Sequence, residues 1–173
     1  MQRLALRSQF EHVAEHGDAP ALRPDRRLAE QSECGIDRDW IGIIALVDAA
    51  LALLGQAPLG PQGRRIAVLG DMLELGPKGK ALHRGLAAPV EANAIDLVFC
   101  CGPLMHSLWQ ALPASRRGGY AEDSAALEAQ VVPAIRAGDV VMVKGSLGSR
   151  MAPIVKALQR VYPHHDTLEE ASA

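Results

Sequence analysis

The feature that most constrains this 173-residue sequence is a short, almost entirely apolar run at residues 66–69, which two arginines precede and Gly70-Asp71 ends. An apolar run of this length between turn residues is typical of a strand buried on both faces of a parallel sheet. Similar runs occur at 96–101 and 140–143, and a shorter candidate lies at 119–121. Segments with helical spacing separate these runs. The alternation predicts an α/β, Rossmann-like fold with a mostly parallel sheet and helices on both faces.

The remaining chain divides around this core. Residues 1–45 form a poorly defined, irregular or helical segment, in which Leu4, Phe10 and Val13 could line a short helix. Residues 46–63 comprise the end of a buried helix (40–54) and a Pro/Gly linker. The α/β unit spans residues 64–162, and a polar tail covers 163–173. Within the α/β unit the spacing predicts helices at 80–92, 104–112, 124–136 and 149–161.

Composition excludes several classes of function. The net charge of −2 gives no electrostatic reason to bind nucleic acid or an anionic membrane. Only 3% of residues are aromatic, which argues against a stacking platform for bases. An odd number of cysteines with an adjacent pair, Cys100-Cys101, does not indicate a disulfide framework or a zinc site. With no secretory signal and no apolar stretch long enough to span a bilayer, we expect a cytoplasmic protein.

Polar residues follow two of the expected strands. Asp71 and Glu74 come after the first, and Lys144, Gly145 and Ser146 come after the last. In open α/β sheets this carboxyl edge is where ligands bind. A lysine there can pair with a carboxylate or phosphate, a glycine permits close approach, and a serine before a helix offers donors to an anion.

Local roles compete with these interpretations. Asp71 could simply cap the loop or the next helix, because Asp favours such positions for local reasons. Lys144 could be a solvated residue at the end of a strand, and Ser146 a helix cap. His83, one turn into the helix after the acidic loop, could face that loop directly or support it from behind.

Several motifs are missing from the sequence. It contains no GxxxxGK[ST] phosphate loop, no GxGxxG after a strand, and no HExxH, CxxC or GxSxG. We therefore predict no metal site and no bound cofactor for this chain alone.

The sequence contains three pieces in this order: GRRIAVLGDMLELG, then His83, then VMVKGSLGSRM with IVKAL behind it. In their order and separation, these pieces resemble the C-terminal domain of the Mur ligases over residues 47–161. The resemblance implies part of an ATP-dependent amide ligase of peptidoglycan synthesis, with ATP and Mg²⁺ as cofactors of the full-length enzyme. It also implies UDP-MurNAc-tripeptide and D-alanyl-D-alanine as substrates. Lys144, Gly145 and Ser146 would bind the dipeptide. The nucleotide side of an interdomain cleft would carry Asp71, Met72, Glu74 and His83.

The chain departs from the family pattern in two places. It has no glycine-rich ATP loop, and RDWIGIIAL stands where the family has an Asp-Ser-Tyr-Asn-Ala-Asn-Pro hinge. The resemblance therefore implies a fragment that is inactive on its own, since the groups that activate the carboxylate are not in the sequence. The alternative is a non-enzymatic module that binds a small anion or works in trans with a separate ATPase domain.

Overall fold

The structure is a computed structural model that describes residues 5–6 and 38–163. The strands are β1 (Ala5–Leu6), β2 (Arg65–Gly70), β3 (Leu97–Cys101), β4 (Arg117–Ala121) and β5 (Val140–Lys144). The α-helices are α1 (Arg38–Gln56), α2 (Gly79–Gly85), α3 (Ala87–Ala92), α4 (His106–Ala111), α5 (Ser124–Ala134) and α6 (Ala152–Val161). Three short 3-10 segments, η1 (Leu73–Lys78), η2 (Ala114–Arg116) and η3 (Leu147–Ser149), complete the described elements.

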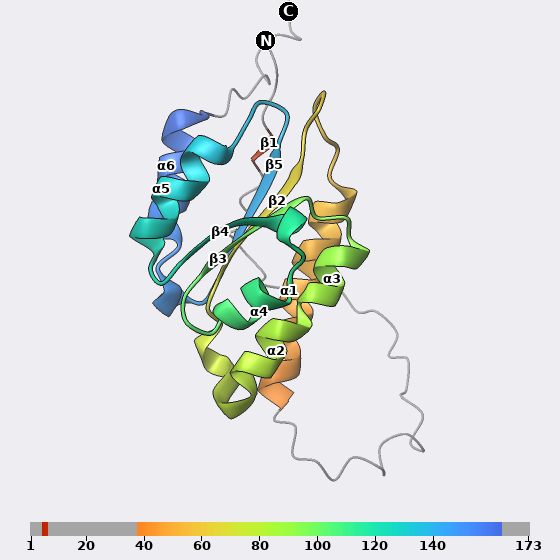
Figure 1. The fold of residues 1–173 in the computed structure, drawn as a ribbon, viewed down its shortest axis with the longest axis vertical. Coiled ribbons are helices and arrows are strands. Elements are labelled where there is room, and N and C mark those ends of the chain that lie inside the picture. Colours follow the sequence, from red (N-terminus) through yellow and green to blue (C-terminus); the bar gives the residue numbers. More distant parts are fainter. Residues whose placement is uncertain (1–4, 7–37, 164–173) are drawn as a thin grey trace, which may run out of the picture.

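All the strands pair in parallel, in the order β1-β5-β2-β3-β4. Helices α5 and α6 cover one face of the sheet, and α1 to α4 cover the other (Figure 1). The predicted fold class is therefore confirmed. Strand β2 lies at the centre of the sheet and is buried from Ile66 to Gly70, which explains why its sequence is apolar throughout rather than alternating.

Successive residues of the central strands place their side chains in two separate hydrophobic clusters, one on each face of the sheet. Ala67 and Leu69 pack with α1 to α4, whereas Ile66 and Val68 pack with α5 and α6. On β3 the same alternation places the Cys100 side chain in the first cluster and the Cys101 side chain in the second. Both thiols are free and buried.

Because these thiols are buried, the free energy of unfolding should fall at alkaline pH. Burial, followed by the charges of Cys101 and Asp71, raises the pKa of Cys100 to about 12. For Cys101, burial and then Asp71 and Asp123 raise the pKa to about 11. An unfolded thiol titrates near pH 8.5. Stability is therefore complete below about pH 8.5 and is lost as the pH rises toward the folded values.

We expect the shifted pKa of Cys100 alone to lower the free energy of unfolding by roughly 2–3 kcal/mol between pH 8 and about pH 10.5. Urea unfolding at several pH values measures this. The Cys100→Ala variant is the control, because it lacks the titrating group and should show a shallower alkaline loss. Equal slopes for the two proteins would contradict the assignment.

Element boundaries differ from the sequence predictions where glycine, proline or tertiary packing intervenes. The prediction of a helix around Leu4 to Val13 is wrong for Ala5–Leu6, which form a strand and pair with Val140 and Val141 of β5. The other residues of that prediction lie outside the described part of the chain. The helix predicted at 80–92 is divided into two after Gly85. Pro89 has no N–H, so it cannot donate a helical hydrogen bond to the Gly85 carbonyl. The last helix begins at Ala152 rather than 149, because Arg150 adopts a left-handed conformation.

Strand β4 is longer than predicted, and its glycines explain why. A Cβ on Gly118 would lie 2.6 Å from the Phe99 ring, and a Cβ on Gly119 would lie 3.0 Å from it. The ring of β3 therefore lies against the bare backbone of β4. Packing, rather than the β-propensity of Arg-Gly-Gly, defines the start of this strand.

The segment interpreted as a Pro/Gly linker is packed against the sheet. Gly60 donates its N–H to the Gly138 carbonyl at 3.1 Å, and Gly63 donates to Gly60 at 2.9 Å. A Cβ on Gly63 would lie only 2.0 Å from the Gly138 carbonyl oxygen. These glycines let two backbone turns touch, so the segment between α1 and β2 is an ordered connection.

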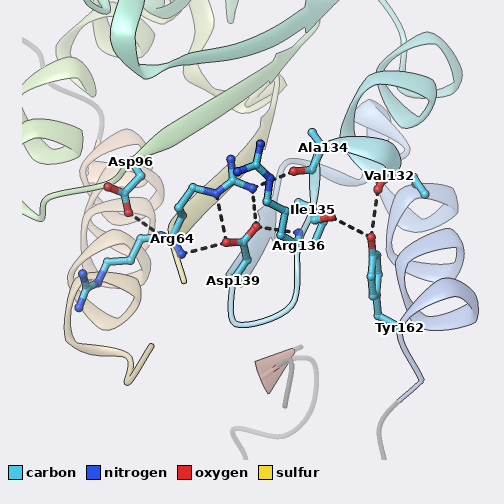
Figure 2. A network of polar contacts seen from close by, with 9 residues as sticks. Arg64, Asp96, Val132, Ala134, Ile135, Arg136, Asp139 and Tyr162 are labelled. Carbon is cyan, nitrogen blue, oxygen red and sulfur yellow. Dashed lines mark hydrogen bonds and ion pairs between the residues drawn. The ribbon is translucent and has the colours of Figure 1, made fainter. Parts of the chain in front are cut away.

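A buried ion pair fixes the amino edge of the sheet (Figure 2). The fully buried carboxylate of Asp139 accepts from Nη2 of Arg64 at 2.6 Å and from its Nε at 3.1 Å. The same carboxylate accepts from the backbone N–H groups of Arg64 and Arg136, each at 2.9 Å. Asp139 therefore joins the start of β2 to the turn that precedes β5.

Candidate functional site

The candidate site lies where the strand order reverses. From β2 the chain proceeds outward to β3 and β4, and then β5 returns to the opposite side of β2. Leu69 and Lys144, near the carboxyl ends of β2 and β5, are register partners. Such a switch point is the place where open α/β sheets bind ligands. The structure thus brings together the two polar strand ends that the sequence singled out.

Asp71 joins the ends of β2, β3 and β5 and is itself buried. Its buried carboxylate accepts from the backbone N–H of Leu104 at 3.1 Å and of Met105 at 2.7 Å, just before α4. Its own N–H donates to the Cys101 carbonyl at the end of β3. Its carbonyl accepts from Ser146 beyond β5. The local role, as a cap, is the role that this side chain has.

Ser146 is fastened to Asp71 through both of its donors. Its N–H and its Oγ–H donate to the Asp71 carbonyl, at 3.1 Å and 2.9 Å. Ser149 Oγ donates in turn to the Ser146 carbonyl at 2.6 Å. Neither donor of Ser146 is therefore free for an anion, which differs from what the sequence suggested.

The glycines at the two strand ends make room for protein rather than for a ligand. A Cβ on Gly145 would lie 2.4 Å from Ser149 Oγ, and one on Gly70 would lie 2.7 Å from the same oxygen. Gly145 also approaches the Gly70 backbone, its Cβ position being 3.1 Å from the Gly70 Cα. Close contact between β2, β5 and the loop after β5 is what requires these two residues to be glycine.

Lys144 is the polar side chain of this edge that remains available. It is half-buried, and its ammonium makes no hydrogen bond or ion pair with any residue that the structure describes. Side chains alternate along β5, so Lys144 lies on the same face of the sheet as Leu69 and the α1 to α4 layer. Glu74, in η1, is exposed and is the other charged candidate that solvent can reach.

His83 holds the loop after β2 from behind. It is fully buried, and its Nε2 accepts the Met72 N–H at 3.0 Å, so Nδ1 carries the proton and donates to the Gly79 carbonyl at 2.6 Å. Met72 is itself buried in the core. Of the residues expected to line the nucleotide side of a cleft, only Glu74 is exposed, whereas Asp71, Met72 and His83 support the loop.

Sequence reasoning missed the contributions of Ser149 and Gly102 to the site. Gly102 has a φ of +106°, and a Cβ there would lie 2.4 Å from the Asp71 carboxylate carbon. Its position directly after an apolar run is a weak signal that the backbone turns sharply. Ser149 carries no local signal, since its partners are made by the fold.

The described residues do not by themselves fit a magnesium–nucleotide site. Among residues 5–6 and 38–163, no group of three or more His, Cys, Asp or Glu side chains is placed to hold a metal ion. The Asp71 carboxylate, at the switch point, is buried, and each of its oxygens accepts a backbone N–H. None of the helices in the described part of the chain is long and apolar enough to cross a membrane.

Comparison with known proteins agrees with this fold. The family model described as "Mur ligase, glutamate ligase domain" matches residues 45–147, more than half of the chain. The chain therefore belongs to the Mur ligase family, and the matched part is its C-terminal domain.

The names of the similar proteins are more specific than the description of the family. The chain is 31% identical over 135 residues to UDP-N-acetylmuramoyl-tripeptide–D-alanyl-D-alanine ligase of Escherichia coli (strain K12), covering 77% of this chain and 28% of that protein. It is 33% identical over 100 residues to the enzyme of the same name from Bacillus subtilis (strain 168), covering 56% of this chain and 22% of the relative. The chain thus spans about a quarter of the length of these relatives.

Solved structures show the same fold. The MurF ligase from Thermotoga maritima in complex with ADP aligns with a TM-score of 0.55 at 21% identity, covering 68% of this chain and 26% of the other. MurF from Acinetobacter baumannii aligns with a TM-score of 0.57 at 18% identity, covering 68% and 25%. At these identities the likeness shows the fold alone.

Proposed function

We propose that this domain is the acceptor-binding part of an ATP-dependent ligase of peptidoglycan precursor synthesis, and that Lys144 binds the carboxylate of D-alanyl-D-alanine. The observation that carries the proposal is the half-buried Lys144 at the switch point, whose ammonium has no partner among the residues that the structure describes. A half-buried lysine without a partner gains most from a carboxylate that enters the site. The names of the sequence relatives supply the dipeptide as the acceptor.

In this proposal the domain binds and orients the acceptor, while the nucleotide-binding groups lie outside the residues described. Cytoplasmic precursor synthesis and a UDP-MurNAc-tripeptide co-substrate remain parts of the same proposal. An ATP-hydrolysis and ligation assay on the 173-residue chain alone should give no product. Turnover that Lys144→Ala abolishes would instead mean that the chain contains a nucleotide site of its own.

Binding of D-alanyl-D-alanine to the chain is the direct test. We expect ¹⁵N backbone shifts to move at residues 144–149 on titration, and Lys144→Ala to weaken the binding at least about tenfold, since a charge-assisted hydrogen bond is lost. Lys156→Ala, an exposed lysine on α6, is the matched control and should bind as the unchanged chain does. Binding that both variants reduce equally, or no binding at all, would overturn the proposal.

A further inference from the structure

We propose that His83 is a proton-sensitive positioning residue. As a neutral ring it holds the peptide group between Asp71 and Met72, and protonation of the ring releases the loop after β5 from that group. This role concerns the chain without any ligand and is therefore independent of the proposed function. It assigns a use to a fully buried titratable side chain that the binding of an acceptor leaves unused.

A single peptide group connects His83 to the loop after β5. The N–H of this group, which belongs to Met72, donates to Nε2 of His83 at 3.0 Å. Its carbonyl, which belongs to Asp71, accepts the N–H of Ser146 at 3.1 Å and the Oγ–H of Ser146 at 2.9 Å. Because a peptide group is planar, its N–H and its carbonyl rotate together. The bond to His83 therefore helps to set the direction of the carbonyl that holds Ser146.

The residues on both sides of this peptide group are anchored separately. The Asp71 N–H donates to the Cys101 carbonyl at 3.0 Å, and the Asp71 carboxylate accepts two N–H groups just before α4. The Met72 side chain is buried in the core. A peptide group can turn between two fixed Cα atoms through opposite changes in the dihedral angles that flank it. Rotation of this one group can thus free Ser146 while β2 and β3 keep their places.

The His83 ring supports the closed arrangement only in its neutral form. Nε2 accepts the Met72 N–H through a lone pair, and Nδ1 donates its proton to the Gly79 carbonyl at 2.6 Å. Protonation adds a second N–H at Nε2, which would point directly at the N–H of Met72. Two donors cannot bond to each other, so the Met72 N–H turns away and the Asp71 carbonyl turns with it.

The surroundings of His83 offer little to stabilise a charged ring in place. In the described part of the chain, no carboxylate bonds to the ring, whose partners are backbone groups. The buried carboxylate of the same loop, that of Asp71, accepts backbone N–H groups instead. The other titratable side chains on α2 and on the segments packed against it, η1, α3 and α4, are all exposed: Glu74, Lys78, Lys80, Arg84, Glu91 and His106. Because an unpaired buried charge is costly, opening of the loop accompanies protonation.

Nuclear magnetic resonance of the ¹⁵N-labelled 173-residue chain without ligand tests this role. The range from about pH 7.5 to about pH 5 brackets the titration of an unconstrained histidine. We expect the ring ¹⁵N signals of His83 and the amide signals of Met72 and Ser146 to change with one common midpoint. The hydrogen-exchange protection factor of the Ser146 N–H should fall roughly five- to tenfold, the factor that one hydrogen bond supplies.

Two matched substitutions separate positioning from simple packing. A glutamine in His83→Gln can accept the Met72 N–H through Oε1 and takes up no proton in this range. Protection of the Ser146 N–H should therefore be retained at neutral pH and no longer fall with pH. His106 is exposed on α4, so His106→Gln should leave the pH profile of Ser146 unchanged. A side chain that only filled space would not produce this difference between the two profiles.

Three results would overturn this role of His83. They are a ring that stays neutral at the acid end of the range, a ring that becomes charged while Ser146 is unaffected, and equal Ser146 profiles for the unchanged chain and His83→Gln. If His83→Gln does not melt cooperatively, the first two results, both measured in the unchanged chain, still decide. None of these measurements involves D-alanyl-D-alanine, so failure of the proposed function would leave them untouched.

Discussion

Replacing Asp139 by alanine is expected to lower the free energy of unfolding by about 3–5 kcal/mol, which is the cost of removing one partner of a buried ion pair. The substitution leaves the guanidinium of Arg64, whose side chain is 23% exposed, without its carboxylate partner. It also removes the acceptor of two backbone N–H groups, those of Arg64 and Arg136. Urea unfolding followed by circular dichroism measures the loss.

Asp96 provides a matched control for this experiment. It too lies at the amino edge, and its carboxylate accepts the Arg65 N–H at 2.7 Å, but the residue is exposed. Water can replace that bond, so Asp96→Ala should cost about 1 kcal/mol or less. If the two alanine variants lose the same stability, burial of Asp139 is not the source of its effect.

The second large effect is expected at Asp71. Asp71→Ala removes the acceptor of the Leu104 and Met105 N–H groups, and an orphaned buried donor costs about 1–3 kcal/mol. We therefore expect a loss of roughly 2–4 kcal/mol. Backbone amide shifts should change at both donors and, because the Asp71 carbonyl holds the loop after β5, also at Ser146.

Glu74→Ala distinguishes this structural role from a direct one. Glu74 is exposed three residues further along the same loop, so its loss should leave the unfolding free energy within about 0.5 kcal/mol. A stable Asp71→Ala protein with unchanged shifts at Leu104 and Met105 would contradict the capping role. It would return Asp71 to the set of residues available to a ligand.

The sequence was sufficient for those parts of the fold that local pattern determines. Continuous apolar runs marked β2, β3 and β5, and the alternation of elements predicted a parallel sheet covered on both faces, as observed. Strand β4 was predicted too short, because its first glycines are fixed by the Phe99 ring and not by propensity. The split of one helix depends on Pro89, whose missing N–H could have been read from the sequence. The start of another depends on the left-handed conformation of Arg150, which appears only in the folded chain.

The meeting of the candidate residues at one edge was predictable from the sequence, but the contacts of each residue were not. Polar residues after two strands were expected to lie together, because the carboxyl ends of parallel strands meet at one edge, and the structure places them side by side. Whether Asp71 caps or binds depended on donors more than 30 residues away, at Leu104 and Met105. Likewise the orientation of the Ser146 hydroxyl depends on a carbonyl 75 residues earlier in the chain. No local sequence pattern predicts hydrogen-bond partners so far away in the chain.

The neighbouring thiols of β3 supply a natural pair of probes for internal motion. Cys100 faces the α1 to α4 layer and Cys101 faces the α5 and α6 layer, although they are consecutive residues. A thiol reagent reaches each one only when its own layer separates from the sheet. The ratio of the two labelling rates under native conditions therefore reports whether the layers detach together or one at a time.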